Sequence, residues 1–127
     1  MDGAAARTTV LVVDDDASLR LLCRVNLELE GYRVLEAATL EDAAETIATE
    51  AVDVILLDVH VGSGDGRVFL RQLRDAETDV RVALFTGSSK LDDEDREIAD
   101  GVLPKPFGLE QLTETVRRLA RPVDSRT

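Results

Sequence analysis

The chain has 127 residues, 44% of them apolar, and a formal net charge of −11. This length and composition predict one globular domain with an ordinary core rather than a disordered chain. The acidic balance argues against direct binding to nucleic acid, whose phosphates attract basic surfaces. Without an apolar stretch of ~20 residues or an apolar leader, membrane insertion and export are not expected. Because a single cysteine, Cys23, cannot form an internal disulfide, we expect a cytoplasmic protein.

Strand-like and helix-like segments alternate along the whole chain. Short apolar runs predict strands, and apolar residues three or four positions apart predict helices. In chain order the predicted elements are strand 9–14, helix 17–30, strand 32–37, helix 40–49, strand 52–58, helix 66–75, strand 80–86, helix 89–100, strand 101–104 and helix 108–120.

Local signals support these boundaries. Helix 17–30 carries an apolar stripe at helical spacing, and Gly31 is placed to end it. The glycines of VGSGDG, residues 61–66, predict a loop. The acidic run DDEDRE, residues 92–97, is typical of a solvated helix face, whereas Cys23 is typical of core packing. The stripe consists of Leu21, Leu22, Val25 and Leu29.

Five strand–helix units in succession predict an α/β fold. Alternation of this kind is typical of a doubly wound, five-stranded parallel sheet with helices on both faces. We expect one domain over residues 1–127, with its core at about 8–120 and flexible ends at 1–7 and 121–127.

Polar residues gather where the predicted strands end, and in an open parallel sheet this edge forms the site. Three carboxylates brought together there would repel one another, and a hard divalent cation or an ammonium group could relieve the repulsion. Hydroxyl and backbone N–H donors at the same edge suit a phosphoryl group, and a carboxylate could accept it as an acyl phosphate. The strand-end residues are Asp14, Asp15, Asp16, Asp58, Thr86, Gly87, Ser88 and Lys105.

Four stretches, VLVVDDDASLR, VDVILLDVHVGSGDG, ALFTGSS and LPKPF, together resemble the receiver domain of two-component response regulators. They occur in the order of that family and at about its spacing, and the resemblance covers roughly residues 8–120. It implies a flavodoxin-like (βα)5 fold with strand order 2-1-3-4-5. It also implies a signalling switch rather than an enzyme that turns over an external substrate.

The resemblance implies a Mg²⁺ (or Mn²⁺) site beside a phosphoryl acceptor. Asp58 is the implied acceptor and also a metal ligand. Asp15 would ligate the metal directly, Asp14 would orient a metal-bound water, and His60 would offer its backbone carbonyl. The side chain of His60, the only histidine, is expected to be an ordinary loop side chain.

The phosphoryl group itself would be held from the two remaining strand ends. Thr86 would hydrogen-bond one phosphoryl oxygen, the Gly87 amide another, and Lys105 would pair with the phosphoryl charge. Two positions depart from the family pattern. Val102 occupies the switch position that usually carries an aromatic ring, and Gly62 replaces a proline in the loop after the acceptor. The stretch from Thr86 to Lys105 is also shorter than usual, which predicts a short fourth helix.

Three functions remain open from the sequence. The first is a phosphorylated switch whose phosphoryl donor is a sensor histidine kinase or a histidine phosphotransfer protein. Its signal would pass to a downstream target protein or to a missing output domain. The second is a pseudo-receiver that only binds partners. The third is a phosphohydrolase with an Asp-x-Asp nucleophile motif at Asp14 and Asp16. Direct contacts with nucleic acid or membrane are not expected.

Overall fold

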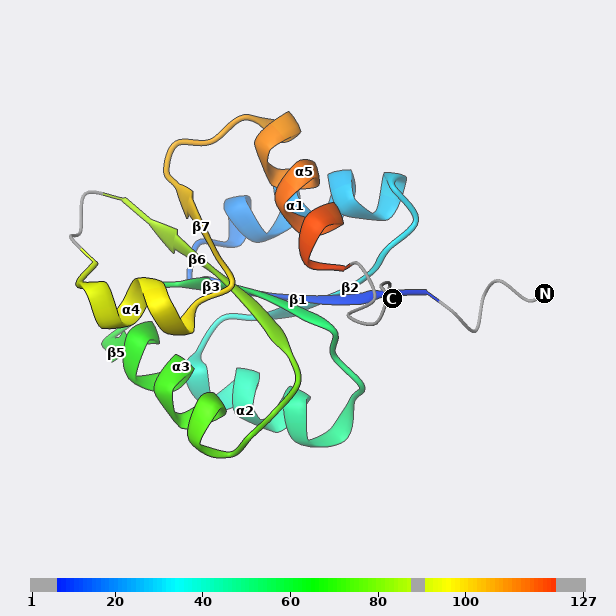
Figure 1. Ribbon diagram of the computed structural model, residues 1–127. Coiled ribbons are helices and arrows are strands. Elements are labelled where there is room, and N and C mark those ends of the chain that lie inside the picture. Colours follow the sequence, from blue (N-terminus) through cyan, green and yellow to red (C-terminus); the bar gives the residue numbers. More distant parts are fainter. Residues whose placement is uncertain (1–6, 88–90, 121–127) are drawn as a thin grey trace, which may run out of the picture.

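A computed structural model describes residues 7–87 and 91–120 (Figure 1). Helices and strands alternate as predicted, with one additional pair of two-residue strands. In chain order the elements are β1 (Thr9–Val13), α1 (Ala17–Leu29), β2 (Arg33–Ala37), α2 (Leu40–Thr49), β3 (Val54–Asp58), β4 (His60–Val61), β5 (Gly64–Asp65), α3 (Gly66–Asp75), β6 (Arg81–Thr86), α4 (Asp93–Ile98), β7 (Gly101–Pro104) and α5 (Leu109–Leu119).

The main sheet has five parallel strands in the order β2-β1-β3-β6-β7. Counted among the five predicted strands, this is the order 2-1-3-4-5, so the predicted fold class is confirmed. Parallel pairing aligns the carboxyl ends of the central strands, and Asp58, the last residue of β3, lies opposite Phe85 of β6. The residues that follow β1, β3, β6 and β7 therefore meet at one edge of the sheet.

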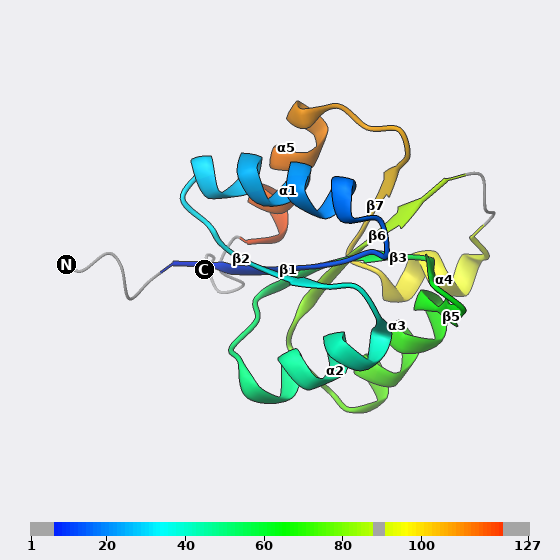
Figure 2. The same cartoon turned by 180° about the vertical axis from the view of Figure 1, so that it is seen from behind.

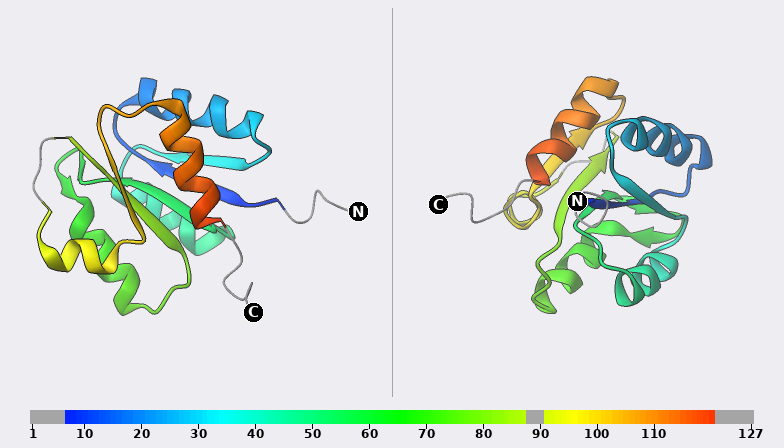
Figure 3. Two further views of the ribbon diagram at one scale, coloured as in Figure 1. Left: turned by 45° about the horizontal axis from the view of Figure 1, so that its top comes forward. Right: turned by 90° about the vertical axis from the view of Figure 1, so that its right-hand side faces the viewer.

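Helices cover both faces of the sheet, with α1 and α5 on one side and α2, α3 and α4 on the other (Figures 1 and 2). The views in Figure 3 show the same three layers obliquely from above and from the side. Because side chains alternate along a strand, Val10 and Val12 of β1 pack in the core cluster under α1 and α5, whereas Leu11 and Val13 pack in the other cluster. Such double coverage explains why β1 and β3 are buried along their whole length.

Helix α1 forms where it was predicted, but its apolar stripe does not face the core. Leu21 is 59% exposed and Leu29 is 79% exposed, and Leu22 and Val25 are also exposed. The core face instead carries Cys23, as predicted for this cysteine, and Leu27. Periodicity correctly identified a helix here, but the α1 sequence is apolar on more than one side and so could not show which side packs on the sheet.

Two other segments differ from the sequence prediction. The predicted loop at 61–66 contains β4 and β5, which pair antiparallel in a small hairpin around Gly62, whose φ is +59°. Helix α4 is much shorter than the predicted 89–100, in agreement with the expectation of a short fourth helix. The predicted flexible ends, except for Arg7, and Ser88 lie outside the described residues. In the part of the chain that the structure describes, no helix has the length and apolar character needed to cross a membrane.

Candidate functional site

Four of the predicted site residues stand at strand ends on one edge of the sheet. Asp14 directly follows β1, Asp58 ends β3, Thr86 ends β6 and Lys105 directly follows β7. The first three are buried, and Asp14 is only 1% exposed. A buried carboxylate needs a partner for its charge, so the neighbours of these residues decide what the site can do.

Three carboxylates converge at this edge. Asp14, Asp15 and Asp58 each offer one oxygen, and these oxygens all lie within 4.8 Å of one another. A group of carboxylate oxygens of this size matches the ligand preference of a hard divalent cation such as Mg²⁺, which keeps several waters and binds a few carboxylates. The donor set therefore fits such a cation, and the prediction that these three aspartates lie together is confirmed.

Lys105 neutralises part of this charge. Its Nζ lies 2.9 Å from Oδ2 of Asp14 and 3.2 Å from Oδ2 of Asp58, so one ammonium group bridges the ends of β1 and β3. Nζ also lies 5.6 Å from the ring centroid of Phe85, which stacks on Phe107 with centroids 5.2 Å apart. The Phe85 ring thus lies within cation–π range of the ammonium group and favours its charged form.

The electrostatics of the cluster reflect burial and these charges. Burial raises the pKa of the Asp14 carboxyl, and the charge of Asp58 adds to this, although hydrogen bonds from the Asp16 amide and Lys105 oppose it. For Lys105, burial by itself favours the neutral amine. The hydrogen bond to Asp14 and the charges of Asp14 and Asp58 outweigh it and raise the pKa of the ammonium group. A site with excess negative charge and a fixed ammonium group is prepared for a cation or for a phosphoryl group bound with one.

The loop after β1 is positioned by backbone contacts that sequence reasoning had not predicted. The Asp16 amide donates to Oδ1 of Asp14 at 2.9 Å, and Nη1 of Arg20 donates to the Asp14 carbonyl oxygen at 2.7 Å. Nε of Arg20 donates to Oε1 of Glu36 at 3.0 Å, which ties this arginine to β2. These contacts join Arg20 to the Asp14 backbone and to a separate strand, and the local sequence pattern carries no signal for them.

Asp16 has a separate role from its two neighbours. Its Oδ1 accepts hydrogen bonds from the amides of Ser18 and Leu19, at 2.9 and 3.3 Å, so it is the N-cap of α1. The triple aspartate at the end of β1 therefore divides into two residues of the acidic cluster and one helix cap.

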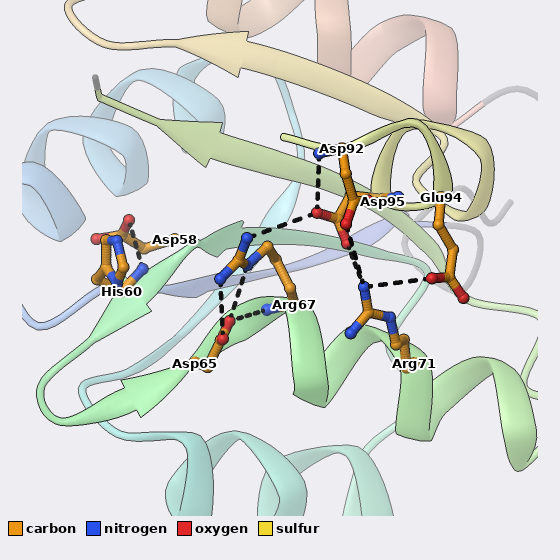
Figure 4. Close-up of polar contacts among 8 residues, drawn as sticks. All are labelled: Asp58, His60, Asp65, Arg67, Arg71, Asp92, Glu94 and Asp95. Atoms are coloured by element: carbon orange, nitrogen blue, oxygen red, sulfur yellow. Dashed lines mark hydrogen bonds and ion pairs between the residues drawn. The ribbon is translucent and has the colours of Figure 1, made fainter. Parts of the chain in front are cut away.

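The β4–β5 hairpin is attached to the acidic cluster by its backbone. The His60 amide donates to Oδ1 of Asp58 at 3.2 Å (Figure 4), and the Gly62 amide donates to Oδ2 of Asp15 at 3.2 Å. The side chain of His60 is exposed, as expected for a loop side chain. Gly66 follows the hairpin, and a Cβ at this position would lie 2.1 Å from the carbonyl oxygen of Asp58, so only glycine fits. Gly66 was predicted to end the loop 61–66 and to begin the helix 66–75, and its close approach to Asp58 was not predicted.

The fourth and fifth strands contribute the remaining predicted residues. Thr86 is buried, and its carbonyl oxygen accepts the Lys105 amide at 2.7 Å. Gly87 is exposed, and among the described residues other than its chain neighbours no atom would lie within 4 Å of a Cβ placed there. Val102 lies in β7 opposite Leu84 and packs against the core under α2 and α3. It is aliphatic, so the switch position holds no aromatic ring.

Comparison with known proteins agrees with this arrangement. The family model of the response regulator receiver domain matches residues 10–117. KdpE, the KDP operon transcriptional regulatory protein of Escherichia coli (strain K12), is 37% identical over 113 residues, which cover 87% of this chain and 50% of that protein. The response regulator MprA of Mycolicibacterium vanbaalenii is 36% identical over 115 residues, with 88% of this chain and 50% of that protein covered. The chain thus spans about half the length of these curated relatives.

The fold has clear counterparts among solved structures. The receiver domain of the Francisella response regulator 1452 superposes with a TM-score of 0.83 at 26% identity, over 90% of this chain and 97% of that one. The family match and this structural counterpart together place the parallel sheet, with its acidic cluster and lysine at the carboxyl edge, in the class of receiver modules. The chain belongs to the response regulator receiver domain family of two-component systems.

Proposed function

We propose that this domain is a phosphorylation-activated switch in which Asp58 accepts a phosphoryl group. The observation that carries the proposal is the position of Asp58 at the strand edge, between the Lys105 ammonium and the carboxylates of Asp14 and Asp15. Asp58 combines a nearly buried carboxylate with a neighbouring cation and a set of metal-ligand oxygens. This is the environment that phosphoryl transfer requires, because transfer depends chiefly on positioning and charge stabilisation.

The proposed donor is a phosphohistidine on a sensor histidine kinase or a histidine phosphotransfer protein. An Asp58 oxygen bonds to phosphorus as the phosphorus–nitrogen bond breaks, and the electron pair of that bond returns to the imidazole. Asp58 thereby becomes an acyl phosphate. Lys105 pairs with a phosphoryl oxygen, and the Thr86 hydroxyl and the Gly87 amide donate to the others.

Asp15, Asp58 and the backbone carbonyl of His60 are the proposed direct ligands of the cation, and Asp14 completes the metal site through a water ligand. A bound Mg²⁺ supplies charge neutralisation between these carboxylates and the incoming phosphoryl group. Asp15 is exposed and so accessible to a hydrated cation, whereas the buried Asp14 is already held by Lys105 and is better placed to orient a water ligand. Mn²⁺ has the same ligand preference.

The phosphohydrolase alternative is not favoured by the geometry. That reading needs Asp16 to act with Asp14, and Asp16 is engaged as the N-cap of α1. The proposed output is a change in the surface around α4, β7 and α5, read by a downstream protein or by an output domain like those of longer regulators. Direct nucleic-acid binding by this domain is not proposed, because its net charge is −11.

The test is the intact mass of the protein after incubation with acetyl phosphate and Mg²⁺. We expect an adduct of about 80 Da, the mass of HPO₃, on the wild type. It should be absent from Asp58→Asn and from wild type with EDTA. Asp75→Asn, a matched change at an exposed aspartate at the end of α3, should keep it. A wild type that gains no adduct under these conditions, and releases no phosphate from acetyl phosphate, refutes phosphotransfer and leaves a receiver-shaped binding module.

A further inference from the structure

Helix α4 contains a charged residue that its sequence does not reveal. The run DDEDRE was expected to be solvated, yet Asp95 within it is 0% exposed. A carboxylate removed from water in this way must be paired. Oδ1 of Asp95 lies 2.8 Å from Nη2 of Arg71, and Oδ2 lies 3.7 Å from Nη1 of Arg67 (Figure 4). Both arginines come from α3, so α4 is held to α3 through one buried carboxylate.

The two arginines differ in a second contact. The guanidinium of Arg67 also donates two hydrogen bonds to Asp65 of β5, with Nε 3.2 Å from Oδ1 and Nη2 3.2 Å from Oδ2. These hydrogen bonds lower the pKa of the Asp65 carboxyl, so Asp65 stays charged. Arg71 instead reaches the exposed Asp92 and Glu94 of the α4 region, at 4.0 and 3.6 Å. One guanidinium, that of Arg67, therefore joins the β4–β5 hairpin to α4 (Figure 4).

The other side of the hairpin is attached to the site. Asp65 pairs across the hairpin with His60, whose amide donates to Asp58, and the Gly62 amide donates to Asp15. These acceptors are the carboxylates that the proposed function assigns to the phosphoryl group and the cation. Formation of the acyl phosphate moves the negative charge from the Asp58 carboxylate to the oxygens of the phosphoryl group, which carries more of it, and a cation competes for the Asp15 oxygen. The acceptors of both hydrogen bonds that hold the hairpin therefore change.

The start of α3 is held in place by contacts that do not depend on the Asp58 and Asp15 carboxylates. The Gly66 amide donates to the Val59 carbonyl oxygen at 2.7 Å, and Gly66 packs directly against the Asp58 backbone. A hairpin whose amides change acceptors therefore shifts relative to this fixed point. Asp65 stands at the junction, because its Oδ1 accepts both the Arg67 amide, at 2.8 Å, as the N-cap of α3, and the Arg67 guanidinium, at 3.2 Å. Val102 occupies the switch position that usually carries an aromatic ring. Its side chain has neither a ring nor a hydrogen-bonding group, so it cannot couple to the phosphoryl site in the usual way.

We infer that Arg67 couples the phosphoryl site to helix α4. Its guanidinium group shifts its ion pairing between Asp65 and the buried Asp95, and this changes how firmly α4 is held to α3. The inference rests on the proposed function of Asp58. In this inference, α4 responds to phosphorylation through the ion pairs that connect it to the hairpin.

The experiment measures amide hydrogen exchange of the α4 segment, residues 92–99, by mass spectrometry, without and with acetyl phosphate and Mg²⁺. The wild type should change its α4 exchange by about twofold or more on phosphorylation, the lower end of ordinary coupling between sites. Arg67→Gln should form the phosphoryl adduct and lose this change. Arg71→Gln is the matched control, because Arg71 also pairs with Asp95 but does not contact Asp65. It should loosen α4 in both states and keep the change.

The outcomes separate the two proposals because intact mass is measured on the same samples. If the wild type forms the adduct and its α4 exchange does not respond, the link through Arg67 is wrong while the switch stands. The link is equally wrong if Arg67→Gln responds like the wild type, or if Arg71→Gln loses the response as completely as Arg67→Gln. If no adduct forms on the wild type, the proposed function fails and the link fails with it.

Discussion

Gly66 offers the sharpest test of how the fold shapes the site. In Gly66→Ala the new methyl carbon would lie 2.1 Å from the carbonyl oxygen of Asp58 and 3.3 Å from Cγ of Leu57. Since ordinary carbon–oxygen contacts are no closer than about 3.3 Å, α3 and β3 must separate by about 1 Å. The obstructing atom is backbone, so side-chain rotation cannot relieve the overlap. The strain belongs at the upper end of overpacking costs, about 3 kcal/mol.

Helix propensity acts in the opposite direction. Alanine is better than glycine inside a helix by about 1 kcal/mol, and by less at the first position of α3. The net expectation is a loss of about 2–3 kcal/mol in the free energy of unfolding, measured by urea denaturation, with slower adduct formation on Asp58. Gly108→Ala is the control, since the nearest atom to a Cβ there is 3.9 Å away, and it should cost about 1 kcal/mol or less. A Gly66→Ala protein within about 0.5 kcal/mol of the wild type would show that this close approach does not constrain the site.

Three further predictions concern packing, charge and thiol chemistry. Leu27→Ala should cost about 2–5 kcal/mol in urea denaturation and Leu29→Ala less than about 0.5, because only Leu27 is buried; equal losses would contradict the orientation of α1. Lys105→Met should cost about 1–2 kcal/mol at pH 7, a figure reduced because the lysine is partly exposed. Mg²⁺ should raise the Tm of this variant more than that of the wild type, and an equal rise would argue that the lysine and the cation do not share the carboxylates. Burial raises the pKa of Cys23 to about 12, which keeps the thiol protonated and leaves about 10⁻⁴ of it as thiolate at pH 8. The folded protein should therefore resist a thiol-specific disulfide reagent that labels it at once in urea, and fast labelling of the folded protein would place Cys23 outside the core.

Much of the site could be predicted from the sequence because strand ends in a parallel sheet share one edge. The apolar runs located β1, β3, β6 and β7, and the residues after them had to converge wherever the sheet formed. The acidic cluster of Asp14, Asp15 and Asp58 and its contact with Lys105 follow from that geometry. Local signals also sufficed for helix existence, since the amphipathic spacing is set by residues within one segment.

The remaining features depend on contacts between segments distant in sequence, which local pattern cannot specify. The side of α1 that packs on the sheet was decided by its neighbours, because Leu29 and Leu27 are equally apolar. Asp95 was expected to be solvated, and it is instead buried where α4 packs on α3, whose Arg71 and Arg67 pair with it. The hairpin at His60–Asp65 is attached to a distant segment by the Gly62 amide, which donates to Asp15, 47 residues away in the sequence. The sequence by itself determined the order of elements and the chemistry at the strand ends, through local periodicity and chain direction. The tertiary structure alone decided which charges are buried and how the site is joined to α4, since burial and ion pairing arise when separate elements pack together.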